Sequence, residues 1–478
     1  PAVTLAAGRS GKSEVLEGVR SLPALESPLP SFCTLYLFVP SGPHRPSAMG
    51  RAHPLVSEGS EFPLSSLPLG SFETSSRGRR LGVAIGESIL DCRALTTDGH
   101  LEAGWGLGEE RLDAHLALGA PAWAEARTAI EQILQPDSHF LSDLELFRHK
   151  YLVNASDATM RMPMRVGDYT DFYLSLEHAR NVGTMFRGAD KALMDNWSCM
   201  PVAYHGRAST VVVSGAVDPR RPWGQVAKPD AGVAPVFKPS AQLDYELELG
   251  YVFGGPSNDI GEPIPLAEAE SRIFGVVLVN DWSARDFQAW EYRPLGPFNG
   301  KNFLTTISPW VVPLTALEPA RCTLPPRLPD AHPTLPYLSS PASANRGIDL
   351  KMEVALTRSD WPVGTEVILT RGNAKMLYWS VAQQVAHHSA GGCSLQSGDL
   401  LATGTISGES IDSRGSLLER SWRGTEPIPM PDGSTRCFLD DGDTVTIRAH
   451  AQGANGERIG FGECKGTVLP ALAPREGW

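Results

Sequence analysis

The sequence lacks the paired cysteines on which disulfide-rich secreted domains and zinc ribbons depend. Its 478 residues include seven cysteines, an odd number, and no two of them form a CxxC pair. So few and so scattered cysteines argue against a disulfide framework or a structural zinc site, and they fit a reducing compartment. We therefore expect a cytoplasmic protein.

Long apolar runs and basic runs are also missing. No apolar stretch reaches the length of a membrane span, and the apolar segment 31–39 is too short for a secretory signal. Lysine and arginine number 42 against 54 aspartate and glutamate residues, which gives a formal charge of −12. Without a cluster of basic residues, we expect neither nucleic acid nor a membrane surface as a partner.

Changes in residue pattern divide the chain into three parts. Residues 1–50 are rich in Ser, Pro, Gly and Ala without periodicity, which indicates a poorly ordered extension. A small domain that ends near residue 160 follows, with a hairpin predicted at 81–91 and helical spacing at 109–134. Beyond it, Gly and Pro turns separate strands predicted at 211–213, 243–253, 273–279, 309–312, 350–356, 400–403 and 444–447, and one helix is expected at 374–389. Because few βαβ units are present, the expected fold is mainly β (α+β) with mostly antiparallel pairing.

Two neighbouring segments carry acids in a pattern that suits a hard metal ion. In 243–249 the acids alternate with apolar residues, so Glu246 and Glu248 point from one face of a strand. The second segment is an apolar run that ends in Asp281, and ligand sites tend to lie where strands end. Adjacent carboxylates repel unless a cation or protons neutralise them, and oxygen ligands favour Ca²⁺ or Mg²⁺. A solvated strand face is the more common explanation of alternating acids, but an acid that closes a buried run needs a partner.

The segment 167–178 is dense in reactive groups. Asp171 could supply another metal carboxylate, Tyr173 a hydrogen bond to a substrate oxygen, and His178 a base that takes up a proton near neutral pH. The alternative is that Asp171 caps a helix over 172–180 and that His178 lies on its surface. The residues alone leave both interpretations open.

Arg285, Gln288 and Lys301 are candidates for stabilising an oxyanion. A helix that began at Asp281 would place Arg285 and Gln288 on one face with it, although each residue alone is more often a surface polar group.

Three other patterns are weaker. The segment 6–13 ends like a phosphate loop without its first glycine. His387 and His388 are adjacent and so do not share a helix face. The segment 204–207 precedes a strand and is either a substrate-facing loop or a structural turn.

Seven blocks make residues 54–472 similar to the fumarylacetoacetase family. They are GDYTDFY (167–173), MFRG (185–188), YHGRAS (204–209), NDWSARD (280–286), WEYRPLGPF (290–298), TGTISG (403–408) and GSLLERSWRGT (415–425). The resemblance implies a small SH3-like β domain at 54–162, a large mixed β-roll domain at 163–472, and a homodimer. It implies hydrolysis of fumarylacetoacetate to fumarate and acetoacetate in tyrosine and phenylalanine catabolism, with a related acylpyruvate or diketo-acid hydrolase as the alternative.

The resemblance also implies a role for individual residues. The metal carboxylates, for Ca²⁺ or Mg²⁺, are Asp171, Glu246, Glu248 and Asp281, with Lys301 and Thr305 close to the ion. The general base is His178, oriented by Glu419, and the oxyanion is stabilised by Arg285, Gln288 and Lys301. The substrate contacts are Tyr173, Arg187, Tyr204, Gln288, Tyr292 and Thr405. Leu304 stands where the resemblance implies glycine, and its side chain is expected to crowd a backbone contact to the ion.

Overall fold

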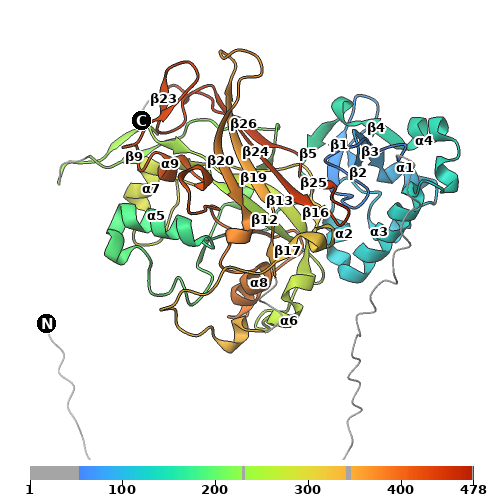
Figure 1. The fold of residues 1–478 in the computed structure, drawn as a ribbon, viewed down its shortest axis with the longest axis horizontal. Helices are drawn as coiled ribbons and strands as arrows, with labels where there is room; N and C mark the ends of the chain where they lie inside the picture. The colour runs from blue at the N-terminus through green and yellow to red at the C-terminus, as the bar shows by residue number, and fades with distance from the viewer. Residues whose placement is uncertain (1–52, 229–231, 341–345, 476, 478) are drawn as a thin grey trace, which may run out of the picture. The chain divides into compact units, whose positions relative to one another are not determined.

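The computed structural model describes residues 53–228, 232–340, 346–475 and 477. The predicted extension 1–50 and the segment 6–13 lie outside these residues. Within them, the mainly β (α+β) fold expected from the sequence is confirmed, with three larger sheets and several short helices (Figure 1).

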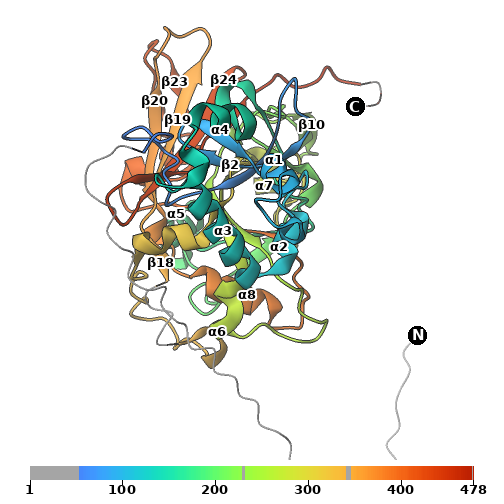
Figure 2. The ribbon, with the colours of Figure 1, turned by 90° about the vertical axis from the view of Figure 1, so that its right-hand side faces the viewer.

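A five-stranded antiparallel sheet forms the N-terminal part, in the order β4-β3-β2-β1-β5. Its strands are β1 (Leu69–Glu73), β2 (Arg80–Ile85), β3 (Ser88–Asp91), β4 (Leu152–Asn154) and β5 (Thr159–Arg161). The hairpin predicted at 81–91 is the pair β2–β3 and is confirmed. Helices α1 (Cys92–Thr97), α2 (Asp113–Leu118), α3 (Ala120–Leu134) and α4 (Leu144–Tyr151) accompany the sheet (Figure 2). The helical segment predicted at 109–134 is therefore two helices, which are separated at Gly119 (φ 87°), a backbone conformation that favours glycine.

The main sheet has eight strands in the order β7-β6-β21-β12-β13-β15-β8, with β16 paired to β13. They are β6 (Tyr169–Phe172), β7 (Ala203–His205), β8 (Val211–Val213), β12 (Leu247–Phe253), β13 (Ile273–Asp281), β15 (Thr305–Ile307), β16 (Val312–Pro313) and β21 (Leu400–Ala402). Only β21–β6 and β15–β8 pair in parallel among the described strands, so the antiparallel prediction holds. The strand predicted at 243–253 is divided into β11 (Leu243–Asp244) and β12. The prediction of a strand at 309–312 is wrong except at Val312, where β16 begins.

Strand β13 is buried at all nine positions because both faces of the main sheet are covered. Leu278 packs in the larger apolar core, whereas Val277 and Val279 pack in a second core together with Ile130 of α3. A strand buried on both faces reads as a continuous apolar run instead of an alternating one. Its terminal acid, Asp281, is consequently held in the interior.

A second sheet, β20-β19-β24-β25 with β26 paired to β24, lies in the C-terminal half (Figure 1). Its strands are β19 (Lys351–Arg358), β20 (Val367–Asn373), β24 (Asp443–Gln452), β25 (Arg458–Gly460) and β26 (Cys464–Thr467). The remaining α-helices are α5 (Leu176–Arg187), α6 (Leu266–Ala269), α7 (Arg285–Glu291), α8 (Val381–Ser389) and α9 (Leu417–Arg420). Four minor pairs occur among the described residues. They are β9 (Trp223–Val226) with β10 (Val236–Pro239), β11 with β14 (Ser283–Ala284), β17 (Arg321–Cys322) with β18 (Gly347–Ile348), and β22 (Ile428–Pro429) with β23 (Thr435–Arg436). The helix predicted at 374–389 begins only at Val381, where Ser380 and Gln383 form a capping box.

Candidate active site

Three carboxylates from strands of the main sheet and a fourth from a break between two strands meet in the interior. Asp171 lies in β6, Glu248 in β12 and Asp281 at the end of β13, while Glu246 occupies the break between β11 and β12. One oxygen of each lies within 4.8 Å of the others. Glu246 is 4% exposed and the other three are less so, which makes a solvated strand face the wrong interpretation.

Several oxygens of this cluster have no partner among the described residues. They are Asp171 Oδ1 and both oxygens of Glu248. Burial, reinforced by the neighbouring carboxylates, raises the pKa of Glu248 well above its ordinary value, and burial together with Asp281 does the same for Asp171. Buried carboxylates without donors need protons or a cation, so these atoms point to an ion site.

Two buried cations lie against the cluster. Lys301 Nζ donates to Asp281 Oδ2 at 2.7 Å and to Glu246, and Arg285 Nη1 donates to Glu246 Oε1 at 2.7 Å. Burial alone would raise the pKa of Glu246, but Lys301 and Arg285 together hold it below its ordinary value. Thr305 Oγ1 donates to Asp281 Oδ1 at 2.6 Å. Lys301 and Thr305 thus contact the cluster through its carboxylates.

The residues present fit a divalent cation. The four carboxylates outnumber the two cations, and the unpartnered oxygens belong to Asp171 and Glu248, which neither cation contacts by hydrogen bonds. An all-oxygen set of this kind suits a hard cation. The four carboxylates would hold it, and it would supply Lewis-acid chemistry at this place.

His178 and Glu419 form a buried pair. His178, on the first turn of α5, is 5% exposed, and its Nδ1 donates to Glu419 Oε2 at 2.7 Å. Burial alone would raise the pKa of Glu419, but His178 together with the hydrogen bonds from Asn181 and Ser416 outweighs burial, and the pKa is lowered. An ionised Glu419 can only accept, so the proton lies on Nδ1 and Nε2 is left as the basic nitrogen. Helix α5 is preceded by Ser175, so the alternative in which Asp171 caps it and His178 lies on its surface is wrong.

Glu419 itself is held by three further donors. Its Oε2 accepts from Ser416 Oγ at 2.8 Å and Ser407 Oγ at 3.0 Å, and its Oε1 accepts from Asn181 Nδ2 at 3.0 Å. Sequence reasoning missed these donors. Only Ser416 carried a signal, because serine followed three residues later by glutamate is typical of a capping box.

Arg285 and Gln288, both predicted for oxyanion stabilisation, contact each other, but they do not lie on a helix that begins at Asp281. Helix α7 begins at Arg285, not at Asp281, which ends β13. Arg285 Nη1 donates to Gln288 Oε1 at 3.0 Å, while its buried Nη2 has no partner among the described residues. Nη2 is therefore an available donor inside the site.

Of the predicted substrate contacts, Tyr173 and Tyr204 lie against this centre, whereas Arg187 has other partners. The Tyr173 ring packs edge-on to His178 with 5.2 Å between centroids, Tyr204 OH donates to Asp281 Oδ2 at 3.2 Å, and Tyr292 follows α7 directly. Thr405 Oγ1 is buried and has no partner among the described residues. Arg187, at the end of α5, donates instead to the carbonyls of residues 191 and 192, at 3.0 and 2.6 Å.

Most of the other sequence candidates have structural partners, and Tyr204 of the segment 204–207 contacts the metal cluster as described above. His387 Nδ1 hydrogen bonds with Tyr337 OH at 3.0 Å and His388 Nε2 with Thr170 Oγ1 at 2.8 Å, so the two histidines face different partners. Residues 204 and 205 belong to strand β7. Leu304 is 6% exposed and belongs to the larger apolar core. None of the described helices combines the length and hydropathy that a bilayer crossing requires.

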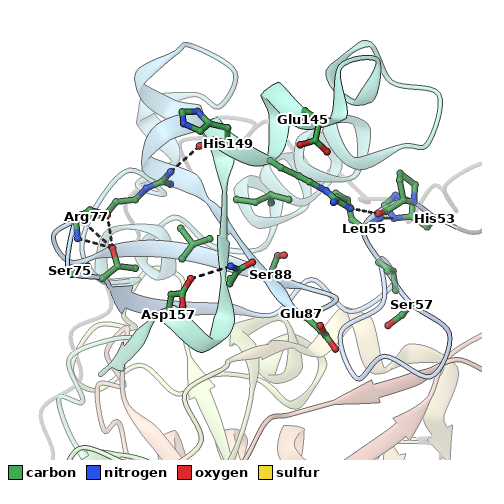
Figure 3. A pocket seen from close by; sticks show the side chains of 18 of the residues that line it. His53, Leu55, Ser57, Ser75, Arg77, Glu87, Ser88, Glu145, His149 and Asp157 are labelled. Carbon is green, nitrogen blue, oxygen red and sulfur yellow. Dashed lines mark hydrogen bonds between the residues drawn. The ribbon is translucent and has the colours of Figure 1, made fainter.

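A cavity of about 1110 Å³ lies in the N-terminal part, and none of the predicted site residues lines it (Figure 3). Its two arginines already have partners. Arg77 donates to Asp91 at 2.8 Å and to the carbonyl of His149 at 3.4 Å, and Arg148 donates to the carbonyl of Pro54 at 3.0 Å. The cavity therefore shares no residue with the carboxylate cluster.

Known proteins share both parts of the chain. The family described as "Fumarylacetoacetase N-terminal" matches residues 65–163, and "Fumarylacetoacetate (FAA) hydrolase C-terminal" matches 169–469. The fumarylacetoacetase of Rattus norvegicus is 49% identical over 427 residues, covering 88% of this chain and 99% of that protein. That of Caenorhabditis elegans is 48% identical over 423 residues, covering 87% and 98%. The solved fumarylacetoacetate hydrolase of Exiguobacterium antarcticum is 17% identical with a TM-score of 0.45, covering 85% of this chain and 100% of that one. With relatives that match over nearly their whole length and family models over both parts, the chain belongs to the fumarylacetoacetase family.

Proposed function

We propose that this chain hydrolyses the carbon–carbon bond of fumarylacetoacetate to fumarate and acetoacetate, the last step of tyrosine and phenylalanine catabolism. The observation that carries the proposal is the buried His178–Glu419 pair close to a four-carboxylate cluster, in a chain of the fumarylacetoacetase family. His178 helps to lower the pKa of Glu246, which supports a single site for the base and the cluster.

The reaction begins with activation of water. With its Nδ1 proton held by Glu419, His178 takes a proton from water through Nε2 as a general base. The hydroxide adds to the carbonyl carbon beside the fumaryl double bond, and its oxygen ends in the new carboxylate of fumarate. The bond to the adjacent CH₂ carbon breaks, and its electron pair stays on that carbon. The proton from His178 then converts this carbon into the methyl group of acetoacetate.

Negative charge on the tetrahedral intermediate needs donors that are already oriented. Hydrogen bonds to Glu246 and Gln288 fix the Arg285 guanidinium, and its Nη2 has no partner among the described residues. Nη2 can therefore donate to the oxyanion without giving up another hydrogen bond. The carboxylates beside Lys301 outweigh the effect of burial and raise its pKa, so the amine stays positive. Both cations therefore favour charge development in a site from which water is largely excluded.

We assign the ion as Ca²⁺ or Mg²⁺, held by Asp171, Glu246, Glu248 and Asp281, because all four donors are oxygens. Such a cation, when bound, stabilises negative charge on substrate oxygens as a Lewis acid. The substrate's terminal carboxylate is assigned to Arg187, whose guanidinium suits carboxylates. Arg187 now donates to two backbone carbonyls, so a substrate must compete with or share these bonds.

The test is the loss of ultraviolet absorbance of fumarylacetoacetate with purified protein, with and without a chelator and with added Ca²⁺ or Mg²⁺. Metal-dependent loss with fumarate and acetoacetate as the only products is expected. No turnover with either ion contradicts the proposal, and turnover of acylpyruvates in its place identifies a related diketo-acid hydrolase.

We also propose a homodimer, a cytoplasmic location and a division into domains at 54–162 and 163–472. An apolar patch supports the dimer: Trp290, Leu295 and Phe298, in and after α7, are 48%, 94% and 68% exposed. For the location, the six cysteines among the described residues are all free thiols, which suits a reducing compartment.

Light scattering tests the proposed dimer. Leu295→Glu is expected to yield monomers and Leu146→Glu, on the exposed face of α4, to leave dimers. Dimers in both variants contradict this patch as the interface.

A further inference from the structure

A buried carboxylate outside the metal cluster, Asp244, accepts four hydrogen bonds. It is the last residue of β11 and is 0% exposed. Its Oδ1 accepts from the backbone N–H groups of Leu417 at 2.7 Å and Tyr245 at 2.9 Å. Its Oδ2 accepts from the N–H of Leu418 at 2.9 Å and from Arg285 Nε at 2.8 Å. Every donor is within ordinary hydrogen-bond distance, so the carboxylate is fully engaged.

Three of these four donors belong to two different parts of the active site, and the fourth is the N–H of the next residue, Tyr245. Leu417 and Leu418 open helix α9, whose next residue is Glu419, the partner of His178. Arg285 contacts Asp244 through Nε and reaches Glu246 and Gln288 through Nη1. The Asp244 side chain therefore links α9, which carries the partner of the base, to Arg285. These two parts of the site are more than 130 residues apart in sequence.

Compensation of the Arg285 charge does not explain this arrangement, because Glu246 already pairs with the same guanidinium at 2.7 Å. The two backbone N–H groups of α9 require an acceptor at a defined place. An asparagine of the same shape can turn only one oxygen toward the four donors, and its NH₂ group then faces other donors. A displacement of about 1 Å in a catalytic group is enough to slow an enzyme about a hundredfold.

We propose that Asp244 is a positioning residue for the hydrolysis: it holds the Arg285 guanidinium and the start of α9 at a set distance from each other. The inference rests on the proposed function, because the groups that it positions act in that reaction. Asp244 does not touch the substrate, so its loss lowers kcat more than it raises KM.

The matched control is Asp443, a second aspartate that is 0% exposed and pairs with arginines. It accepts from Arg358 at 2.7 Å, from Arg436 at 3.1 Å and from a backbone N–H at 2.8 Å, away from the site. Asp443→Asn therefore reproduces the loss of a buried, arginine-paired charge. It separates a general loss of stability from a loss of positioning.

The experiment compares kcat, KM, Ca²⁺ affinity and thermal unfolding of the parent, Asp244→Asn and Asp443→Asn, with kinetics well below each unfolding temperature. Asp244→Asn is expected to lose about a hundredfold in kcat, with KM and Ca²⁺ affinity close to those of the parent. Asp443→Asn is expected to lose thermal stability and keep its kcat. In the double variant with Glu419→Gln the losses are expected to be less than additive, because both changes act on one arrangement.

If Asp244→Asn does not fold, Asp244→Glu takes its place, since it keeps the charge and moves it by one CH₂ group. It is expected to fold and still lose kcat. A folded variant at position 244 that keeps the parental kcat, or fully additive losses with Glu419→Gln, overturns the inference while the hydrolase assignment stands. A parent protein that does not hydrolyse fumarylacetoacetate overturns the proposed function, and this inference with it.

Discussion

Replacing Glu419 by glutamine removes a single buried charge from the pair that activates water. The glutamine oxygen can still accept from His178 Nδ1, and Asn181 can turn its amide to suit the new NH₂ group, so the geometry survives. What is lost is the attraction between the carboxylate and the imidazolium that forms when His178 takes the proton. For charge centres about 4 Å apart at an effective dielectric constant of about 20, this attraction is about 4 kcal/mol. At about 1.36 kcal/mol per tenfold change in rate, kcat is expected to fall about a thousandfold.

The assay is the initial rate of absorbance loss of fumarylacetoacetate at saturating substrate, with circular dichroism to verify folding. Glu177→Gln is the control: it removes an equal charge from α5, but that charge pairs with the exposed Arg180 at 2.6 Å. Its kcat is expected to change by less than about threefold, as for other exposed ion pairs. A Glu419→Gln variant whose kcat is within about tenfold of the parental value would refute the reasoning. Such a result would mean that the charge of Glu419 does not assist proton transfer to His178.

Two further outcomes concern the ion and the core. The pKa values of Asp171 and Glu248 are raised by burial, so the folded, ion-free protein holds protons that the unfolded chain releases above about pH 4. These two groups therefore stabilise the ion-free protein less as pH rises, whereas buried histidines with lowered pKa values, such as His115 and His388, stabilise it more. The quantity that isolates the cluster is the rise in melting temperature on adding Ca²⁺, which is expected to be larger at about pH 8 than at about pH 6 because the ion then displaces fewer protons. An equal rise in melting temperature on adding Ca²⁺ at the two pH values contradicts this. Leu304→Ala is expected to lower the free energy of unfolding in urea by about 2–5 kcal/mol, because Leu304 is buried in the larger core. The crowding predicted from the sequence implies tighter Ca²⁺ binding by the same variant in calorimetry, and an unchanged affinity contradicts that prediction.

The carboxylate cluster was predictable to a large extent from local patterns. Alternation of period two placed Glu246 and Glu248 on the same side of the chain, and Asp281 closed a run that reads as a buried strand. What alternation could not show is the break after Asp244, where two residues leave the strand and the N–H of Glu246 donates to Asn280 Oδ1 at 3.2 Å. An unbroken strand would place Asp244 on the same face as Glu246 and Glu248, whereas in the structure Asp244 accepts from Arg285 and from the N–H groups of α9.

Helix boundaries were predicted less well because residues distant in sequence decide them. Asp171 before an amphipathic segment is a reasonable helix cap, but it lies in β6, whose pairing with β21 brings in residues more than 200 positions later. Asp281 remains in β13 because β12 and β15 pair with it on both sides. Tertiary pairing thus overrides a local capping preference at both acids.

The sequence by itself determined which residue types are available and at what local spacing. It established the alternating acids, the buried run before Asp281, the absence of paired cysteines and the motif blocks of the family, because these depend only on neighbouring residues. Only the tertiary structure decided that His178 meets Glu419, 241 residues away, and that Asp244 joins Arg285 to α9. The physical reason is that a buried carboxylate must find donors wherever the fold brings them, and the sequence does not state which distant N–H groups will be there.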